Sequence, residues 1–369
     1  MKSGALPSQT IRSLIQSGII TGGSEERIQP ASLDLALTET VYRIEYIFQP
    51  RPNESIEDIL NEMGATPHDL ANPFERGVMY LAKLSESLKL PKNVSARCNP
   101  KSSTGRNDLQ VRVLADGVPR FDTIPAGFTG NLWIVIMSKS FPVKLPTNES
   151  LSQMRFFYAD ASSHISEEEL RTSLEQDKLF WRHSGEKPFT NDEIKIRDND
   201  GSLILTVDII NEGITAWECL GLNRILDFTK RNYYKPTDFF RPISVDSGSI
   251  YLKQDNFYIL RSRERVRIPP NLSSEMIPMD ERSGEFRSHY SGFIDPGWGY
   301  GINGDGNGRP LVLEVRPFED LVLRDNQPIA KIVFDTMHEK PDIIYDALER
   351  SHYTGEPKNP KLSKHFITS

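Results

Sequence analysis

The stretch Tyr80-Leu-Ala-Lys-Leu-Ser-Glu-Ser-Leu-Lys-Leu-Pro91 returns 178 residues later as Tyr258-Ile-Leu-Arg-Ser-Arg-Glu-Arg-Val-Arg-Ile-Pro269. The Tyr, Glu and Pro positions are identical, and most of the apolar positions match. A second block, residues 145–156, matches residues 323–334 at the same offset of 178. Because two separated blocks share one offset, we interpret the chain as a tandem duplication of one module.

Each module is predicted to consist of short strands. Residues 132–137, 311–315 and 329–334 are rich in β-branched, aromatic and other apolar side chains. Pro, Gly, Asn and Asp interrupt such runs at short intervals, as is typical of antiparallel sandwiches and barrels. The length of 369 residues fits about two domains of ordinary size.

Helical patterns are few. Residues 10–17 fit a short amphipathic helix, and residues 166–180 begin with a Ser N-cap and an acidic first turn. The second helix lies between the repeats, so we place the domain boundary near residue 160. We expect a first module over 1–160, and a helical junction, a second module and a C-terminal tail over 161–369.

Composition excludes several classes of protein. The net charge of −7 argues against a broad nucleic-acid interface, although a local pair of basic residues could still bind a small anion. No apolar run approaches the ~18 residues of a membrane-spanning helix, and the first residues lack a signal-peptide pattern. With two cysteines and no C-x-x-C pair, disulfides are not expected. We expect a cytoplasmic protein.

Metal-ligand spacings are also missing from the sequence. The seven histidines form no H-x-x-x-H or H-x-E pattern, and Cys98 lies far along the chain from Cys219. A zinc site is therefore not expected, and no residue is assigned as a metal ligand.

A polar loop in the first copy has the composition of a phosphate-binding segment. Residues 99–107 read Asn-Pro-Lys-Ser-Ser-Thr-Gly-Arg-Asn, and their hydroxyl and cationic groups can donate to phosphate oxygens. The candidates in this copy are Lys101, Ser102, Ser103 and Arg106. The counterparts in the second copy are Arg282, Ser283 and Arg287, which keep the Ser-x-x-x-Arg spacing. A polar loop with an ordinary helix cap remains the alternative interpretation.

A carboxylate in the second copy interrupts an apolar strand. Residues 293–300 form a turn-rich element. It is followed by a Gly- and Asn-rich loop and then by the strand that contains Glu314. Such a carboxylate either faces water or is buried for a purpose, and a partly desolvated Glu can act as a general base. The ungapped offset of 178 places Ile136 opposite Glu314, so the two copies differ where a base would lie.

Together these segments resemble the dCTP deaminase family of the trimeric dUTPase superfamily. Residues 28–35 resemble its first motif, and residues 101–106 resemble its (Arg/Lys)-Ser-Ser-x-x-Arg motif. Residues 294–298, followed by a strand Glu, resemble its base-binding hairpin and catalytic glutamate. The tail that begins at Tyr345 resembles its nucleotide-covering segment, with His352 and Glu356 where the family usually has Lys and Gln. The length resembles the double-module form of the family.

The resemblance implies a mainly β protein of two tandem dUTPase-like modules (β-clip, distorted barrel or jelly roll) with a helical junction. It implies hydrolytic deamination of dCTP to dUTP and ammonia without protein-bound zinc, for the supply of dUMP and thymidylate. Mg²⁺ would be bound through the triphosphate. In this interpretation Glu314 activates water, and Ser102 and Arg106 stabilise the developing charge. The implied substrate-binding residues are Lys101, Ser103, Arg282, Ser283, Arg287, Asp295, Trp298, Tyr345, His352 and Glu356.

The copies have diverged in opposite ways, since the first keeps both serines and the second keeps the glutamate. We therefore expect a composite site, with residues 101–106 from the first copy and Asp295, Glu314 and the tail from the second. The alternatives are a bifunctional enzyme that also hydrolyses dUTP, a plain dUTPase using Asp295 or Asp122, and a non-catalytic nucleotide sensor. The expected partners are dCTP, dUTP, dTTP as an inhibitor and further copies of the chain in trimeric packing, with no nucleic acid and no membrane.

Overall fold

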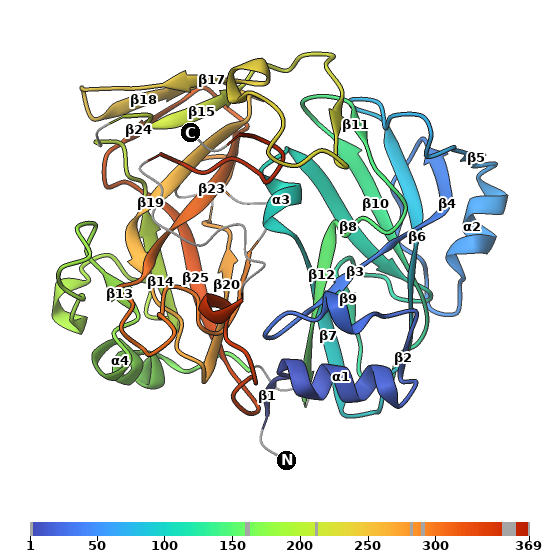
Figure 1. The fold of residues 1–369 in the computed structure, drawn as a ribbon, viewed down its shortest axis with the longest axis horizontal. Coiled ribbons are helices and arrows are strands. Elements are labelled where there is room, and N and C mark those ends of the chain that lie inside the picture. The colour runs from blue at the N-terminus through green and yellow to red at the C-terminus, as the bar shows by residue number, and fades with distance from the viewer. Residues whose placement is uncertain are drawn as a thin grey trace.

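The computed structural model describes residues 3–158, 163–210, 213–280, 283–288, 292–348 and 359–367. Figure 1 shows two β-rich halves that lie side by side, with the N-terminus at their lower boundary. The predicted mainly β fold of two tandem modules is confirmed. The proposed boundary at residue 160 falls among residues outside the described ranges and stays a prediction.

The first half pairs two antiparallel sheets. One has the strand order β5-β4-β6-β10-β8 with β2 on β6, and the other has the order β1-β12-β7-β9 with β3 on β12. Its helices and 3-10 turn are α1 (Ser8–Gln16), η1 (Glu25–Arg27), α2 (Ile56–Glu62) and α3 (Ser102–Gly105). Its strands are β1 (Gly4–Ala5), β2 (Ile20–Thr21), β3 (Leu33–Leu35), β4 (Leu37–Ile44), β5 (Thr66–Pro67), β6 (Met79–Lys89), β7 (Val94–Pro100), β8 (Leu109–Ala115), β9 (Thr123–Ile124), β10 (Thr129–Ser138), β11 (Val143–Lys144) and β12 (Ser152–Tyr158).

The second half repeats this plan, with the sheets β17-β15-β19-β23-β21 and β14-β25-β20-β22 and with β13 on β19. Two further pairs are β18-β24 and the parallel pair β11-β16, which joins the halves. Its helix and 3-10 turns are α4 (Glu167–Gln176), η2 (Asn191–Glu193), η3 (Pro236–Asp238) and η5 (Tyr345–Ala347). Its strands are β13 (Phe180–Trp181), β14 (Ser202–Thr206), β15 (Ala216–Cys219), β16 (Leu226–Asp227), β17 (Phe240–Ile243), β18 (Ser249–Leu252), β19 (Tyr258–Val266), β20 (Leu272–Ile277), β21 (Phe286–Arg287), β22 (Phe293–Ile294), β23 (Arg309–Pro317), β24 (Leu321–Arg324) and β25 (Pro328–Thr336).

The strands predicted over 132–137, 311–315 and 329–334 are confirmed as parts of β10, β23 and β25. The helix predicted over 10–17 is α1, which begins two residues earlier. The helix predicted over 166–180 starts at its Ser166 capping box as expected, but it ends at Gln176. Its predicted end was wrong because Lys178 adopts a left-handed backbone (φ 53°) and the following residues pair with β19.

Helix α2 was not predicted from the sequence. Its N-cap is Ser55, whose side chain accepts a hydrogen bond from the backbone N–H of Asp58. Ser or Thr followed three residues later by an acidic side chain is a known sign of a helix start. The seven-residue length of α2 leaves only two buried apolar positions, which is too short a pattern to stand out.

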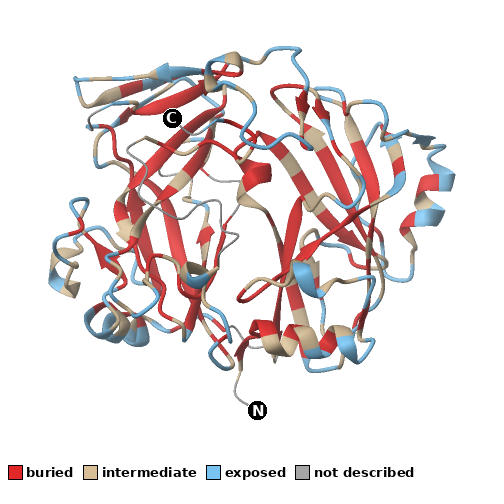
Figure 2. Ribbon diagram, in the orientation of Figure 1, coloured by how far each residue is buried: buried red, intermediate tan, exposed pale blue. Residues whose placement is uncertain are grey.

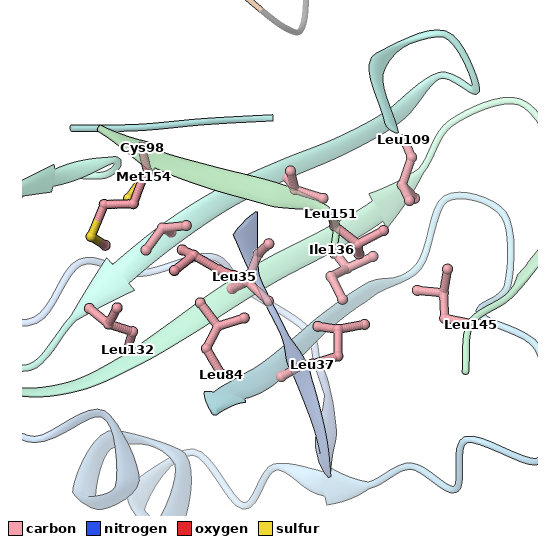
Figure 3. Close-up of a cluster of buried hydrophobic side chains, with 14 of the residues drawn as sticks. Leu35, Leu37, Leu84, Cys98, Leu109, Leu132, Ile136, Leu145, Leu151 and Met154 are labelled. Carbon is pink, nitrogen blue, oxygen red and sulfur yellow. The ribbon is translucent and has the colours of Figure 1, made fainter. Parts of the chain in front are cut away.

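One large apolar core fills the first half and continues into the second. It contains first-half residues such as Leu84 and Met154 (Figure 3) and second-half residues such as Trp217 and Ile259. A separate core lies inside the second half, between its own two sheets. Figure 2 shows buried strands on both sides of the boundary between the halves. The halves therefore pack tightly rather than being joined by a loose linker.

Strand register changes the expected correspondence between the copies. In the first half, Tyr80 of β6 pairs with Ile136 of β10. In the second half, the equivalent Tyr258 of β19 pairs with Val315 of β23. Ile136 therefore corresponds to Val315. Ile136 lies in the core of the first half (Figure 3), and Val315 lies in the core of the second half.

The residue that corresponds to Glu314 is therefore Val135. Val135 pairs with Leu81, just as Glu314 pairs with Ile259. The expectation that Ile136 lies opposite Glu314 was wrong because the second copy has one more residue between the two paired strands, so that β10 and β23 correspond at an offset of 179 rather than 178. By the ungapped alignment and by the strand pairing alike, the first copy has an apolar residue at the position where the second copy has a carboxylate.

Within the described ranges, none of the helices is both long enough and apolar enough to cross a membrane.

Candidate active site

A cavity of about 770 Å³ lies between the two halves. Helix α3 of the first half lies beside β23 of the second half at this boundary (Figure 1). The cavity is lined by eight of the residues predicted from the sequence: Lys101, Ser102, Ser103, Arg106, Asp295, Trp298, Glu314 and Tyr345. Pockets of this size accommodate ligands as large as a nucleotide.

Glu314 approaches the first half very closely. A methyl group added to Gly105 of α3 would lie 2.8 Å from Cδ and from both carboxylate oxygens of Glu314. The glutamate side chain is buried, with 1% of the residue exposed. The carboxylate of one copy is thus brought against the Ser-Ser loop of the other copy, which is the arrangement expected for a composite site.

Local hydrogen bonds hold the α3 loop in place. The Thr104 hydroxyl donates to the carbonyl of Leu151 at 2.8 Å, and the Asn107 side chain donates to the carbonyl of Ser103 at 2.7 Å. Arg106, whose residue is 5% exposed, donates from Nη1 to the carbonyl of Lys361 at 3.0 Å. The loop therefore presents its Ser and Arg side chains from a backbone that is fixed on both sides.

An ion pair lies at the part of the cavity wall that residues 28–35 form. Lys101 pairs with Asp34, the aspartate of the 28–35 segment, and both residues line the cavity. Gln29 donates to the same carboxylate at 3.3 Å. The other carboxylate oxygen of Asp34 is buried and has no hydrogen-bond partner among the described residues. Asp34 is a candidate that the sequence analysis quoted within a motif but did not single out.

Asp295 of the hairpin is held by a residue of the first half. Arg155 on β12 is fully buried, and its Nη2 lies 3.2 Å from Oδ1 of Asp295. The same guanidinium donates to the carbonyl oxygens of Ser274 and Ile294 at 3.0 and 3.3 Å. Burial raises the pKa of Asp295, and the charge of Arg155 opposes that rise. Arg155 therefore fixes the hairpin from across the boundary.

Further polar contacts join the same strands across the boundary. Arg97 on β7 lies 3.4 Å from Glu275 and 3.3 Å from Asp335. The Asn99 side chain accepts a hydrogen bond at 2.6 Å from the backbone N–H of Gly292, just before the hairpin. Strands β7 and β12 thus set the position of the hairpin relative to α3. The sequence carried no local sign of this role.

Tyr345 closes one side of the cavity together with Trp298. Their ring centroids are 5.0 Å apart, and the backbone N–H of Tyr345 donates to the carbonyl of Pro296 at 2.8 Å. Gly297 has a φ of 91°, and an added Cβ there would lie 2.4 Å from Cβ of Ile344. The hairpin glycine is therefore needed for this close approach, because a side chain would displace the segment that carries Tyr345.

Of the five remaining predicted residues, two are placed away from the cavity lining and three lie outside the described residues. Ser283 and Arg287 do not appear among the described residues that line the cavity, so the structure does not bring them together with Glu314. Arg287 instead lies near Asp122 of the first half: burial raises the pKa of Asp122 to about 6, and Arg287 is among the cations that oppose this rise. Arg282, His352 and Glu356 lie outside the described residues.

The corresponding strand face of the first copy is apolar. There Val135 belongs to a buried apolar cluster with Trp133, and two residues of α2, Ile56 and Leu60, complete it. Helix α2 lies on the outer side of the first half (Figure 1). The face of β10 that is equivalent to the Glu314 face of β23 is therefore covered by a helix of its own half.

Several cationic residues of the cavity wall were missed by the sequence analysis, among them Arg12, Arg231 and Lys364. Arg231 and Lys364 both line the cavity, and each lies more than a hundred residues from the 101–106 loop. A single basic residue in a polar segment carries no pattern that could have revealed them. Among the described residues, no group of three or more His, Cys, Asp or Glu side chains is arranged to hold a metal ion.

Comparison with known proteins shows which family the whole chain resembles. The family model for the 2'-deoxycytidine 5'-triphosphate deaminase (DCD) N-terminal domain matches residues 2–160, and the model for the C-terminal domain matches residues 170–366. The crystal structure of 2'-deoxycytidine 5'-triphosphate deaminase from Agrobacterium tumefaciens is similar, with a TM-score of 0.83 and 34% identity. It aligns over 92% of this chain and 97% of that chain.

Two curated relatives are named "dCTP deaminase, dUMP-forming". The protein of Methanosphaera stadtmanae is 30% identical over 138 residues, which are 36% of this chain and 66% of that protein. The protein of Methanobrevibacter smithii is 28% identical over 160 residues, which are 41% of this chain and 78% of that protein. The chain thus spans about two thirds of the length of the first relative.

Proposed function

The chain belongs to the family of dCTP deaminases, enzymes that act on this nucleotide, and we propose that it hydrolyses dCTP to dUTP and ammonia at one composite site. The observation that carries the proposal is the approach of Glu314 to Gly105. It brings the carboxylate of the second half to the Ser-Ser loop of the first within one cavity. A general base and hydrogen-bond donors on opposite sides of a cavity suit water attack on a bound ring.

The proposed reaction uses Glu314 twice as a proton carrier. Glu314 takes a proton from water and passes it to N3 of cytosine while the water oxygen adds to C4. It then takes the proton of the new hydroxyl and passes it to the amino group, which leaves as ammonia. Ser102 and Arg106 stabilise the charge that develops on the ring during the attack. One water is consumed, and dUTP remains.

The remaining wall residues bind the nucleotide. Lys101 and Ser103 hold phosphate oxygens, and Asp295 with the Trp298 hairpin holds the deoxyribose and the base. Tyr345 covers this end, and we retain His352 and Glu356 as tail contacts. Mg²⁺ would arrive bound to the triphosphate and would neutralise part of the phosphate charge. The orphan carboxylate oxygen of Asp34 described above suits a water of that hydrated ion.

Product analysis tests the reaction. Purified protein is incubated with dCTP and Mg²⁺, and ammonia and pyrophosphate are measured together. Ammonia with accumulating dUTP is the expected result. Neither product from dCTP, together with dUMP formation from added dUTP, would overturn the proposal and leave a plain dUTPase.

Two matched serine variants test the composite site. Ser102→Ala is expected to lower kcat by about 10²-fold, as removal of one charge-stabilising donor typically does. Ser283→Ala is expected to leave kcat within about twofold, because Ser283 does not line the cavity. An intact kcat in Ser102→Ala with a lost kcat in Ser283→Ala would contradict the assignment.

The second candidate is a bifunctional enzyme that continues from dUTP to dUMP and pyrophosphate. It is favoured by the names of the two dUMP-forming relatives. Asp295 and Asp34 are carboxylates of the same cavity that could activate water at the α-phosphate. Equal amounts of ammonia and pyrophosphate in the product analysis would select this candidate.

We also retain two proposals about partners, inhibition by dTTP and assembly of several chains with trimeric packing of modules. The cavity described here is lined by two halves of the same chain. Dilution is therefore expected to separate any oligomer without loss of specific activity, which sedimentation and initial rates at matched concentrations can measure.

A further inference from the structure

The end of the chain returns to the cavity. Residues 359–367 follow the predicted tail, and Lys364 within them lines the cavity at the side of the first half. The Lys364 ammonium lies 3.0 Å from Oε1 of Glu149, and the side chain is 15% exposed. This lysine is 263 residues from Lys101, yet the fold places both on one cavity wall.

Several contacts hold the backbone around Lys364. The Ser363 hydroxyl donates to Oδ1 of Asn107, in the loop after α3, at 2.8 Å. The carbonyl of Lys364 accepts from the backbone N–H of Asn232 at 2.9 Å. Phe366 packs into a cluster of aromatic rings that includes Phe239 and Phe240. Because residues on both sides are fixed, binding of a ligand by Lys364 would cost little further backbone entropy, while the ion pair with Glu149 restrains its side chain.

The surroundings of Lys364 are crowded with positive charge. Burial lowers the pKa of Lys364, Glu149 opposes this, and the charges of Arg231 and Lys101 lower the pKa further. Arg231 and Lys101 line the same cavity. Holding cations together in a partly desolvated site is unfavourable unless an anion compensates them. Glu149 and Asp34 compensate part of this charge, and a phosphate chain would add several more negative oxygens for the three cations, since lysine binds phosphate as a point charge.

We propose that Lys364 is a ligand of the phosphate chain of the nucleotide, so that the C-terminal segment 359–367 completes the triphosphate site that the 101–106 loop begins. The inference rests on the proposed composite site. In the absence of nucleotide, Glu149 holds the ammonium near its binding position. When the triphosphate binds, phosphate oxygens join or replace that carboxylate as partners of Lys364.

The test compares the two members of the ion pair. Lys364→Met removes the ammonium, and Glu149→Gln removes its carboxylate partner, so both variants lose the same salt bridge. Lys364→Met is expected to raise the KM for dCTP by about tenfold or more, the usual effect of one lost charge-assisted hydrogen bond, with kcat within about twofold. Glu149→Gln is expected not to raise KM. Lys364→Arg should restore part of the affinity.

A second measurement separates this inference from the proposed function. Calorimetric titration with tripolyphosphate reports phosphate binding without any reaction, and Lys364→Met is expected to weaken it as much as it weakens dCTP binding. Equal effects of Lys364→Met and Glu149→Gln on KM would overturn the inference, because the ion pair alone would then explain them. Unchanged tripolyphosphate binding in Lys364→Met would also overturn it. If the wild-type protein deaminated no dCTP, the proposed function would fail, and the titration would still decide the role of Lys364.

Discussion

Strands β10 and β23 occupy equivalent places in the two halves, yet their outer faces have opposite surroundings. The face of β10 carries Trp133 and Val135 and is covered by α2. The face of β23 carries Glu314 and lies against α3 of the other half. A buried carboxylate needs polar partners, whereas an apolar face needs only a cover. In the first half this strand face is therefore structural, and the first half contributes to the shared cavity through its α3 loop. In the second half the equivalent face carries the carboxylate of the cavity.

The largest expected effect comes from changing the two equivalent residues of these faces, Glu314 and Val135. Glu314→Gln is expected to lower kcat by about 10³-fold, as loss of a general acid–base typically does, with dCTP binding retained. The reciprocal Val135→Glu is expected to add no activity and to lower stability, because it places a carboxylate in an apolar cluster. Steady-state kinetics, calorimetric binding and thermal melting measure both variants. A kcat within tenfold of wild type in Glu314→Gln would show that Glu314 is not the general base, and that the faces of β10 and β23 do not differ in catalytic role.

The contact between the halves can be tested at Gly105. A methyl group added there would lie 2.8 Å from the Glu314 carboxylate. Gly105→Ala is therefore expected to displace the carboxylate and lower kcat by about 10²-fold.

Gly130→Ala is the matched control, since its methyl would meet the Phe128 ring at the same 2.8 Å but away from the cavity. It should cost stability and leave kcat unchanged. Equal kcat losses in Gly105→Ala and Gly130→Ala would show that crowding in general, rather than displacement of Glu314, explains the effect.

The sealed face of the first half predicts an effect on stability alone. Leu60 of α2 is 3% exposed within the apolar cluster. Leu60→Ala is expected to lower the free energy of unfolding by about 2–5 kcal/mol without a change in kcat/KM, because α2 does not line the cavity. Exposed Glu62 on the same helix is the control, and Glu62→Ala should change stability by less than about 0.5 kcal/mol. Denaturant unfolding and initial rates check both statements.

The glutamate shared by the two repeat blocks predicts a pH effect. Burial raises the pKa of Glu86 to about 7, and its carboxylate accepts from the backbone N–H of Ala36 at 3.0 Å. Because the folded state holds this proton more tightly, the stability that Glu86 contributes is full below pH 4.5 and is lost as pH rises through 7.

The free energy of unfolding of wild type, relative to Glu86→Gln, should therefore fall by about 3 kcal/mol across that interval. The equivalent Glu264 in the second half is also buried, and burial raises its pKa too. Denaturant unfolding at a series of pH values measures the difference. A constant difference between wild type and Glu86→Gln would contradict the prediction.

Much of the site could be predicted from local sequence. The 101–106 loop and the hairpin with Glu314 stood out because short-range chemistry shapes them, and the cavity contains both. Arg155 could not be predicted, because a lone arginine in a strand resembles any other. It holds Asp295 only because β12 packs against β20 and the hairpin of the other half.

The correspondence between the copies shows the same limit. Aligned residue by residue, the sequence placed Ile136 opposite Glu314, whereas strand pairing places Val135 there. A length difference of one residue between the paired strands moves every side chain of the second strand to the other face, and only the strand pairing shows it. Helix α2, which covers Val135, is likewise defined more by what it packs against than by its seven residues.

The sequence by itself determined the duplication, the β-rich modules and the chemistry that each copy retains, because repeats, strand patterns and motif spacings are local properties of a chain. Only the tertiary structure decided which loop meets Glu314, which face α2 seals and that Lys364 reaches the cavity from the end of the chain. The physical reason is that these contacts join residues far apart in sequence. Burial and packing between the two halves select them, and no local pattern records that selection.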